Sequence, residues 1–484
     1  MKITDLKPEM VWKYFHQITQ VPRPSKKEGQ IIRYLESFAT AHHIAIKKDA
    51  AGNILMSKPA TPGYENLPVV ILQSHVDMVC EKNADKVFDF EKDAIETVVD
   101  GEWLRAKGTT LGADNGIGVA AELAILASND IEHGPIECLF TVDEETGLSG
   151  AKALEADFMS GKILLNLDSE DEGEIFIGCA GGKDTQAELA YQPIPSSPAR
   201  EHFRIDVKKL SGGHSGGEIH RGLGNANKIL VRFLFLLKKK LDFQLATIQG
   251  GNLRNAIARE AYAVIGLLPD EKEEVRVMLN HFAAQVEYEL KSIDPKVCIQ
   301  MQSVEAPATY IDPQTAEKLI YALHACPHGV IAMSHDIEGL VETSTNLASV
   351  KTLDDRILIG TSQRSSIESS KEAVANQVAS TFLLAGAVVT QGDGYPGWAP
   401  NPQSQILKTA KESYLRLFHK EPQIKAIHAG LECGLFLEKY PYLDMISFGP
   451  TLRDVHSPNE RIQIDTVALW WQFLLDLLKS IPAI

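Results

Sequence analysis

The chain has 484 residues, of which 44% are hydrophobic and 23% are charged, and its formal net charge is −16. This composition is ordinary for globular proteins and excludes a wholly disordered or fibrous chain. The length exceeds what one hydrophobic core usually fills, which predicts two domains. An acidic surface repels phosphate backbones and anionic lipids, which argues against nucleic acids and membrane surfaces as partners.

The chain lacks the marks of export or membrane insertion. Its first residues, MKITDLKPEM, show no signal-peptide pattern, and no apolar run approaches the roughly 18 residues of a membrane span. Six cysteines are scattered without CxxC pairs. We therefore expect a cytoplasmic protein without a disulfide framework, and neither a cysteine-ligated zinc site nor a redox function.

The first third of the sequence alternates helical and strand patterns. Helices are expected at 10–20, 26–43 and 116–128, and strands at 67–72, 136–142 and 162–167. The apolar run LPVVIL, 67–72, is typical of a strand that is covered on both faces. The alternation predicts an α/β domain with parallel strands.

From about residue 186 the pattern becomes that of an α+β insert. Strands are expected at 202–207 and 261–268, and helices at 225–237, 271–290 and 370–385. The turn-rich segment 391–402 is expected to link the insert back to the first domain. A helix at 405–418, a strand at 445–449 and a closing helix at 467–478 then resume the first pattern. We therefore predict a catalytic domain of residues 1–185 and 394–484, interrupted by an inserted domain of residues 186–393.

Potential metal ligands follow the expected strands. The ligands after the first three strands are His75 and Asp77, then Asp143, Glu144 and Glu145, then Asp168, and a loop after the strand at 445–449 holds His456. Open parallel sheets bind their ligands beyond the carboxyl ends of the strands. We therefore expect these side chains to meet at one edge of the sheet.

A further carboxylate, Asp114, stands in GTTLGADNGIGVA just before the helix expected at 116–128. The order of glycines there does not fit a nucleotide-binding loop. Imidazole and carboxylate ligands without thiolates are typical of a catalytic zinc site, and this set suffices for two ions that share one carboxylate. The tandem Glu144–Glu145 offers one acid for metal binding and one for proton transfer.

Each of these residues alone has an ordinary structural interpretation. Asp114 can cap a helix, His75 and His456 can be structural histidines, and SGGHSGG at 211–217 can be a flexible turn. Their order and spacing together resemble the two-zinc metallopeptidase family of glutamate carboxypeptidase and acetylornithine deacetylase, and within it the dipeptidases. The likeness runs through QSHVDMVCEKN, GTTLGADNGIG, DEETG, NLDSEDEGEIFIGCAGG, SGGHSGGEI, HAGLECGLF and SFGPTLRDVHSPNE.

The resemblance implies a fold and a metal centre. The fold would be a zinc-exopeptidase-like domain with a mixed, mostly parallel sheet, plus an inserted α+β lid and dimerisation domain. Two Zn²⁺ ions, replaceable by Co²⁺ or Mn²⁺, would share Asp114, with His75 and Asp168 on one ion and Glu145 and His456 on the other. Asp77 would orient His75, Glu144 would act as general base and then acid, and the Asp114–Asn115 peptide bond would be cis.

The resemblance also implies an activity, which is hydrolysis of dipeptides with broad specificity, including Xaa-His, by a metal-activated water. His214 in SGGHSGG would reach the active site of the partner in a homodimer formed through the lid and stabilise the oxyanion. Asn255, Arg364 and the backbone of Gly430 would contact the substrate, although Arg364 also has an interpretation as a surface charge. Two alternatives keep the metal motifs: an N-acyl amino acid amidohydrolase of the same family, and a non-catalytic metal- or peptide-binding protein.

Overall fold

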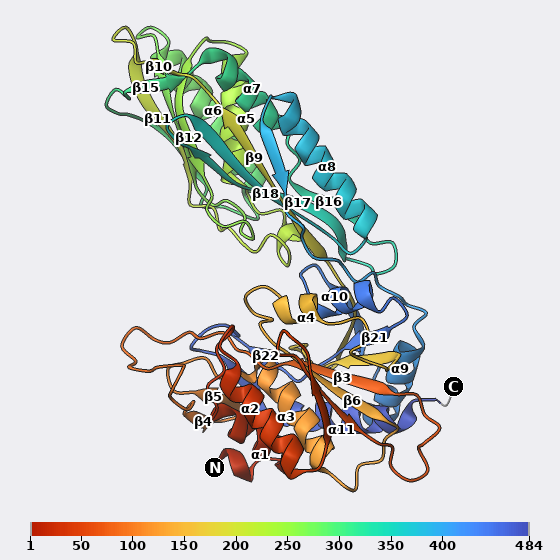
Figure 1. Cartoon of the computed structure of the whole chain (residues 1–484). Helices are drawn as coiled ribbons and strands as arrows, with labels where there is room; N and C mark the ends of the chain where they lie inside the picture. Colours follow the sequence, from red (N-terminus) through yellow and green to blue (C-terminus); the bar gives the residue numbers. More distant parts are fainter. Residues whose placement is uncertain (1, 483–484) are drawn as a thin grey trace. The chain divides into compact units, whose positions relative to one another are not determined.

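The computed structural model describes residues 2–482 and divides into two compact units (Figure 1). The first unit comprises residues 1–178, 400–426 and 431–484, and the second comprises residues 179–399 and 427–430. The second unit is therefore an insertion into the first, and it takes a short segment from the return of the chain as well.

An eight-stranded sheet forms the centre of the first unit. Its order is β1-β2-β6-β3-β7-β21-β8-β20. The strands are β1 (Ala45–Lys48), β2 (Ile54–Lys58), β6 (Ile136–Thr141), β3 (Val70–His75), β7 (Ile163–Asn166), β21 (Asp444–Ser447), β8 (Glu174–Cys179) and β20 (Gln423–Ile427). Every residue of β3 and β6 is buried, as the continuous apolar patterns predict.

This sheet is mixed, as predicted, but its parallel pairs are confined to the middle. β3 pairs in parallel with β6 and β7, and β21 pairs in parallel with β7, whereas β1, β2 and β8 join through antiparallel pairs. The register of the two central strands sets His75 opposite Thr141. Because the four parallel strands run the same way, the loops that follow them leave one edge of the sheet.

Helices and a small second sheet complete the first unit. The helical segments are η1 (Ile3–Asp5), α1 (Glu9–Thr19), α2 (Gly29–Ala41), α3 (Ala113–Ala127), α4 (Ser149–Ala153), α9 (Gln405–Phe418), α10 (Glu432–Lys439) and α11 (Ile464–Ser480). The small sheet has the order β22-β23-β5-β4, with β22 (Leu452–Arg453), β23 (Arg461–Gln463), β5 (Trp103–Ala106) and β4 (Thr97–Asp100). α1 has a buried face that includes Trp12 and Phe15 and contacts α3, and α3 in turn contacts β3.

The second unit is built on an antiparallel sheet. The strands follow the order β14-β11-β13-β12-β17-β18-β9-β19, and β16 pairs with β17 beside this path. They are β14 (Cys298–Ser303), β11 (Glu201–Lys208), β13 (Ala261–Leu267), β12 (Gln244–Gly250), β17 (Val341–Thr352), β18 (Arg356–Ser365), β9 (Gly181–Ala190), β19 (Val388–Gln391) and β16 (Gly329–Met333). A separate pair joins β10 (Pro193–Pro195) to β15 (Thr309–Ile311).

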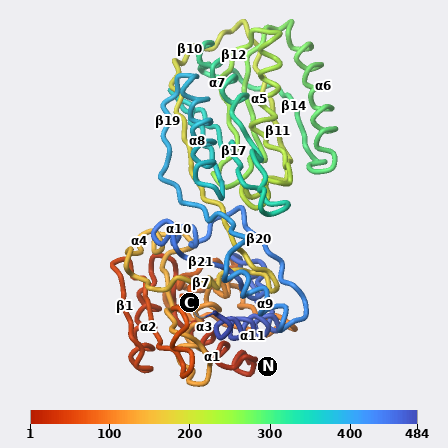
Figure 2. Tube along the Cα trace, turned by 90° about the vertical axis from the view of Figure 1, so that its right-hand side faces the viewer, coloured from red at the N-terminus to blue at the C-terminus, as the bar shows by residue number. Residues whose placement is uncertain are grey.

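Four helices pack on this sheet (Figure 2). They are α5 (Ala226–Lys238), α6 (Lys272–Leu290), α7 (Pro313–Ala325) and α8 (Glu368–Leu384), and a short turn, η2 (Ile219–Arg221), precedes α5. The alternation along β11 shows which face they cover: Phe203, Ile205 and Val207 belong to the same buried core as the helices, whereas Arg204 and Asp206 line an open groove. The insert is thus an α+β unit, as expected.

The boundaries between the two units differ from those that the sequence pattern indicates. The pattern places the passages near 185 and 394, but residues 179–182 already lie beside 395–398, through the bridges Cys179–Trp398 and Gly182–Tyr395. The amide of Ala180 also donates to the carbonyls of Ile427 and Ala429, each at 3.0 Å. These backbone pairings between distant segments explain why residues 427–430 belong to the second unit.

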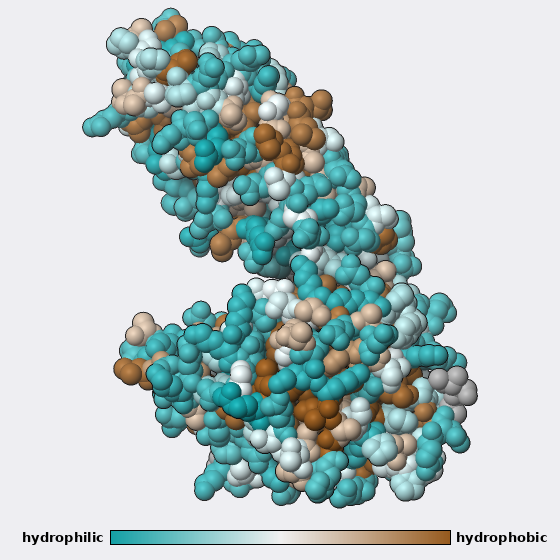
Figure 3. All heavy atoms as spheres, viewed as in Figure 1, coloured by the Kyte–Doolittle hydropathy of each residue, from teal (hydrophilic) through white to brown (hydrophobic). Residues whose placement is uncertain are grey.

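Hydrophilic side chains cover most of the face seen in Figure 3, and hydrophobic side chains gather there in separate patches. Among residues 2–482, none of the helices combines the length and the apolar character that crossing a bilayer requires.

One buried carboxyl in the core of the first unit should make folding depend on pH. Glu122 on α3 is fully buried and accepts a hydrogen bond of 2.7 Å from the Ser74 hydroxyl. Burial raises the pKa of Glu122 well above its ordinary value of 4.5. At a pH above 4.5 but below the raised pKa, the folded state holds a proton that the unfolded state has lost. The free energy of unfolding therefore falls as pH rises through this range.

We expect Glu122→Gln to remove this dependence. Its free energy of unfolding relative to the wild type should rise between pH 5 and pH 8 by up to about 1.4 kcal/mol per pH unit, as measured by urea unfolding. Glu155→Gln, at an exposed position, is the control, and its difference from the wild type should stay flat. A constant difference for Glu122→Gln would contradict the prediction.

Candidate metal centre

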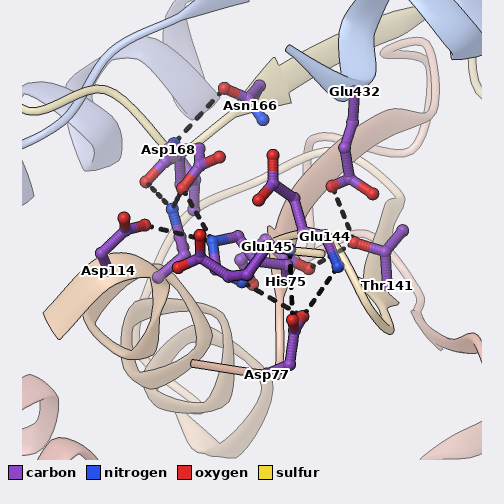
Figure 4. Close-up of polar contacts among 12 residues, drawn as sticks. His75, Asp77, Asp114, Thr141, Glu144, Glu145, Asn166, Asp168 and Glu432 are labelled. Carbon is purple, nitrogen blue, oxygen red and sulfur yellow. Dashed lines mark hydrogen bonds and ion pairs between the residues drawn. The ribbon is translucent and has the colours of Figure 1, made fainter. Parts of the chain in front are cut away.

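The five predicted metal ligands come together at the edge of the large sheet where the parallel strands end, and Figure 4 labels all of them except His456. They are His75 at the end of β3, Asp114 in the first turn of α3, Glu145 after β6, Asp168 after β7 and His456 after β22. Asp114 and Asn115 have non-helical backbone angles, so the regular helix begins only after them. The peptide bond between them is cis, as the resemblance implies.

The two carboxylate oxygens of Asp114 face two different groups of ligands. Oδ1 lies 3.1 Å from Nε2 of His75, which is 3.3 Å from Oδ1 of Asp168. Oδ2 lies 3.1 Å from Nε2 of His456, which is 3.0 Å from Oε2 of Glu145. The geometry therefore divides the five side chains into two groups, with Asp114 common to both.

These distances fit metal coordination. Two donors on one tetrahedral zinc ion, each bound at about 2.0–2.1 Å, lie roughly 3.3–3.4 Å apart. The observed separations of 3.0–3.3 Å are close to that value. Each group offers one imidazole and two carboxylates, which is a donor set for catalytic zinc that leaves room for a fourth ligand. The residues present can thus hold two ions.

The electrostatics of the group show that it needs positive charge. Burial acts to lower the pKa of His75, but the charge of Asp168 and the hydrogen bond to Asp114 outweigh it and raise that pKa well above its usual value. Hydrogen bonds to Asp114 and Glu145 raise the pKa of His456 to about 11. Burial raises the pKa of Asp168 to about 6. Bound metal ions would replace the protons of these groups, so metal binding should release protons.

Asp77 fixes the surroundings of the ligands. Its Oδ1 lies 3.4 Å from Nδ1 of His75 and accepts the backbone N–H of Glu144 at 3.0 Å, and its Oδ2 accepts the N–H of Glu145 at 3.3 Å and the Ser25 hydroxyl at 2.8 Å. Burial opposes ionisation, but the contacts with His75 and these hydrogen bonds lower the pKa of Asp77 to about 2. The carboxylate is placed to orient both the imidazole and the Glu144–Glu145 turn.

Glu144 lies half-buried beside the ligands, as Figure 4 shows. Burial raises its pKa well above the usual value, and the negative charges of Asp168, Glu432 and Glu145 act in the same direction. A carboxyl with a raised pKa beside the ligands is a candidate for proton transfer.

Two further residues support the site, and the ligand pattern did not single them out. Glu432, at the start of α10, accepts hydrogen bonds from Nε2 of Gln73 at 2.6 Å and from the Thr141 hydroxyl at 2.8 Å. The side-chain amide of Asn115 donates to the carboxylate of Asp168 and to the carbonyl of Leu167. Both stand inside motifs of the resemblance, HAGLECGLF and GADNG, and that is the signal that could have found them.

The other predicted site residues, His214, Asn255, Arg364 and Gly430, lie in the second unit. Nδ1 of His214 accepts the backbone N–H groups of Gly216 at 3.3 Å and Gly217 at 3.0 Å, so the ring proton is on Nε2. Burial and the charge of Arg364 lower the pKa of His214, which keeps the ring neutral. Asn255 and His214 line one groove of about 1020 Å³.

Arg364 and Gly430 share a neighbour. Arg364 is 8% exposed, so it is not a surface charge, and its Nη1 donates to the Tyr395 hydroxyl at 2.9 Å. A side chain at position 430 would begin 2.8 Å from the Tyr395 ring, so glycine is needed there. The structure thus gathers this pair around Tyr395, while the metal ligands gather in the first unit.

Known proteins resemble this chain over its whole length. Residues 71–480 match the profile of Peptidase family M20/M25/M40. The cytosol non-specific dipeptidase of Escherichia coli is 44% identical over 482 residues, which are 100% of this chain and 99% of that protein. The crystal structure of aminoacylhistidine dipeptidase from Vibrio alginolyticus has a TM-score of 0.95 at 42% identity and covers 100% of this chain and 99% of its own.

A more distant structure shares the fold alone. It is a tripeptidase from Staphylococcus aureus, with a TM-score of 0.57 at 16% identity over 98% of this chain and 99% of its own.

The grouping of ligands around Asp114 predicts how metal binding responds to mutation. We expect the wild type to bind two Zn²⁺ ions in calorimetric titration of metal-stripped protein. His75→Ala and His456→Ala should each weaken one of the two, because each removes a ligand of one group only. Asp114→Ala should weaken both. Equal effects of all three variants would contradict the division into two groups.

Proposed function

The chain belongs to Peptidase family M20/M25/M40, and from this premise we propose that it is a zinc-dependent dipeptidase of the cytoplasm. The observation that carries the proposal is the division of the Asp114 oxygens between two imidazole–carboxylate groups, with Glu144 beside them. The 44% identity over the full length to a dipeptidase supports dipeptides as the substrates.

Two Zn²⁺ ions held by His75 with Asp168 and by Glu145 with His456, and shared by Asp114, would supply a polarised substrate carbonyl and a water of lowered pKa. Co²⁺ and Mn²⁺ accept the same ligands. Asp77 holds the imidazole of His75 and the Glu144–Glu145 turn in place for this purpose.

Glu144 carries the proton through the reaction. Its carboxylate takes a proton from the attacking water and then delivers it to the departing amine, so one group serves as base and as acid. Its position on the turn that Asp77 fixes keeps it beside the ligands without making it one of them.

The second unit supplies the contacts to the substrate. The guanidinium of Arg364 pairs with the free α-carboxylate, which distinguishes a dipeptide from a longer chain, and Asn255 and the backbone of Gly430 hold the rest. In a homodimer formed through this unit, His214 of the partner subunit donates its Nε2–H to the developing oxyanion. The proton position that the Gly216 and Gly217 amides impose suits that role.

A hydrolysis panel tests the substrate class. Metal-stripped protein, with and without Zn²⁺, is given an unblocked Xaa-His dipeptide, the same dipeptide with a blocked amino end, a tripeptide and an N-acetyl amino acid. We expect zinc-restored cleavage mainly of the free dipeptide. Glu144→Gln should bind zinc like the wild type and lose about 10²–10⁴-fold in kcat. Preferred cleavage of the N-acetyl compound would indicate an amidohydrolase, and zinc binding without any cleavage would indicate a non-catalytic protein.

Mixed dimers test the shared site. Glu144→Gln and His214→Ala homodimers should both be nearly inactive. A purified heterodimer of the two contains one site with intact Glu144 and an intact partner histidine, so it should recover about half of the wild-type rate per dimer. If His214 instead served its own subunit, both sites of the heterodimer would be defective and no activity would return.

A further inference from the structure

The first turn of α3, which carries Asp114, is capped by a carboxylate from far along the chain. Oε2 of Glu460 accepts the backbone N–H groups of Leu111 at 2.7 Å and Gly112 at 2.9 Å. Its Oε1 accepts those of Ala113 at 2.7 Å and Asp114 at 3.4 Å. Residues 111–114 lead into the regular part of α3, and one buried side chain satisfies their four consecutive backbone amides.

Glu460 also belongs to the segment that carries another ligand. His456 stands four residues earlier, in the left-handed backbone region with φ of 61°. The amide of Glu460 donates to the carbonyl of Ser457 at 3.0 Å, which closes the intervening turn. The segment 456–460 therefore contacts Asp114 twice. The imidazole of His456 contacts the carboxylate of Asp114, and the carboxylate of Glu460 accepts the backbone N–H of Asp114.

A buried arginine extends this frame to a third ligand. Arg23 donates through Nη1 to the carbonyls of Val76 at 3.0 Å and Asp77 at 2.9 Å, directly after His75, and through Nη2 to the carbonyl of Gly112. Burial lowers the pKa of Arg23, and among the negative charges that oppose this effect, that of Glu460 acts most strongly. A side chain at position 116 would begin 2.6 Å from the guanidinium, so Gly116 leaves the room for it.

We propose that Glu460 is a positioning residue of the metal centre, which together with Arg23 locks the backbones that carry His75, Asp114 and His456 into one arrangement. It touches none of the reacting atoms. Its effect is to hold both oxygens of Asp114 toward their two groups before any ion arrives, so that metal binding needs little rearrangement. The inference rests on the proposed metal centre and adds a residue that sets its affinity.

The test compares two buried glutamates that accept backbone amides in the first unit. Glu460→Gln keeps the shape of the side chain but replaces one acceptor oxygen by an NH₂ group that faces amide donors. Glu137→Gln is the matched control. Glu137 on β6 is also buried and accepts the amides of Ser160 at 2.8 Å and Gly161 at 3.1 Å, away from the predicted ligands.

Both variants should lower the melting temperature of the metal-free protein. Only Glu460→Gln should lower the affinity for Zn²⁺, by about 10–100-fold, as is usual for residues that support metal ligands. The affinity is measured on folded protein by competition with a chromophoric chelator. The visible absorption of bound Co²⁺ should also change in Glu460→Gln and match the wild type in Glu137→Gln, because it reports the geometry of the ligands.

If Glu460→Gln does not fold, Glu460→Asp replaces it. That variant keeps the charge but withdraws the oxygens by one carbon, and it should lose more zinc affinity than Glu137→Gln. A wild-type zinc affinity in the folded Glu460 variant, or an equal loss in Glu137→Gln, would overturn the inference and leave the metal centre standing. Failure of the wild type to bind Zn²⁺ would overturn the metal centre and the inference together.

Discussion

Buried negative charge is the constraint on which the first unit depends. Carboxylates from several segments meet at one edge of the large sheet, where little water screens their repulsion. Three of them are matched by donors: Asp77 by the Glu144–Glu145 turn, Asp168 by the Asn115 amide, and Asp114 by two imidazoles. These donors fix where each oxygen points, and two divalent ions would supply the positive charge that the set still needs.

The two units carry different kinds of polar groups. The first presents the candidate metal ligands beyond parallel strands that are fully buried, which suits atoms that must keep their separations to fractions of an ångström. The second presents hydrogen-bonding and cationic side chains, with His214 and Asn255 in loops and Arg364 on β18 of the antiparallel sheet.

Local patterns in the sequence predicted the central elements well. The runs around β3, β6 and β7 are apolar because both faces of those strands are buried, and such runs are visible without a structure. The edges of the sheet and the passages between the units were predicted less well. They depend on pairings such as Gly182 with Tyr395, which join residues more than 200 positions apart and leave no local periodicity.

The sequence by itself determined the alternation of strands and helices, the insertion of an α+β unit, and the imidazole and carboxylate side chains that follow the central strands, because each of these depends on residue types at short spacing. Only the tertiary structure decided which oxygen of Asp114 faces which histidine, and that Glu460 and Arg23 hold the backbones of the ligands. Those contacts form between segments that lie up to about 350 positions apart, and their geometry exists only once the sheet has brought the segments together.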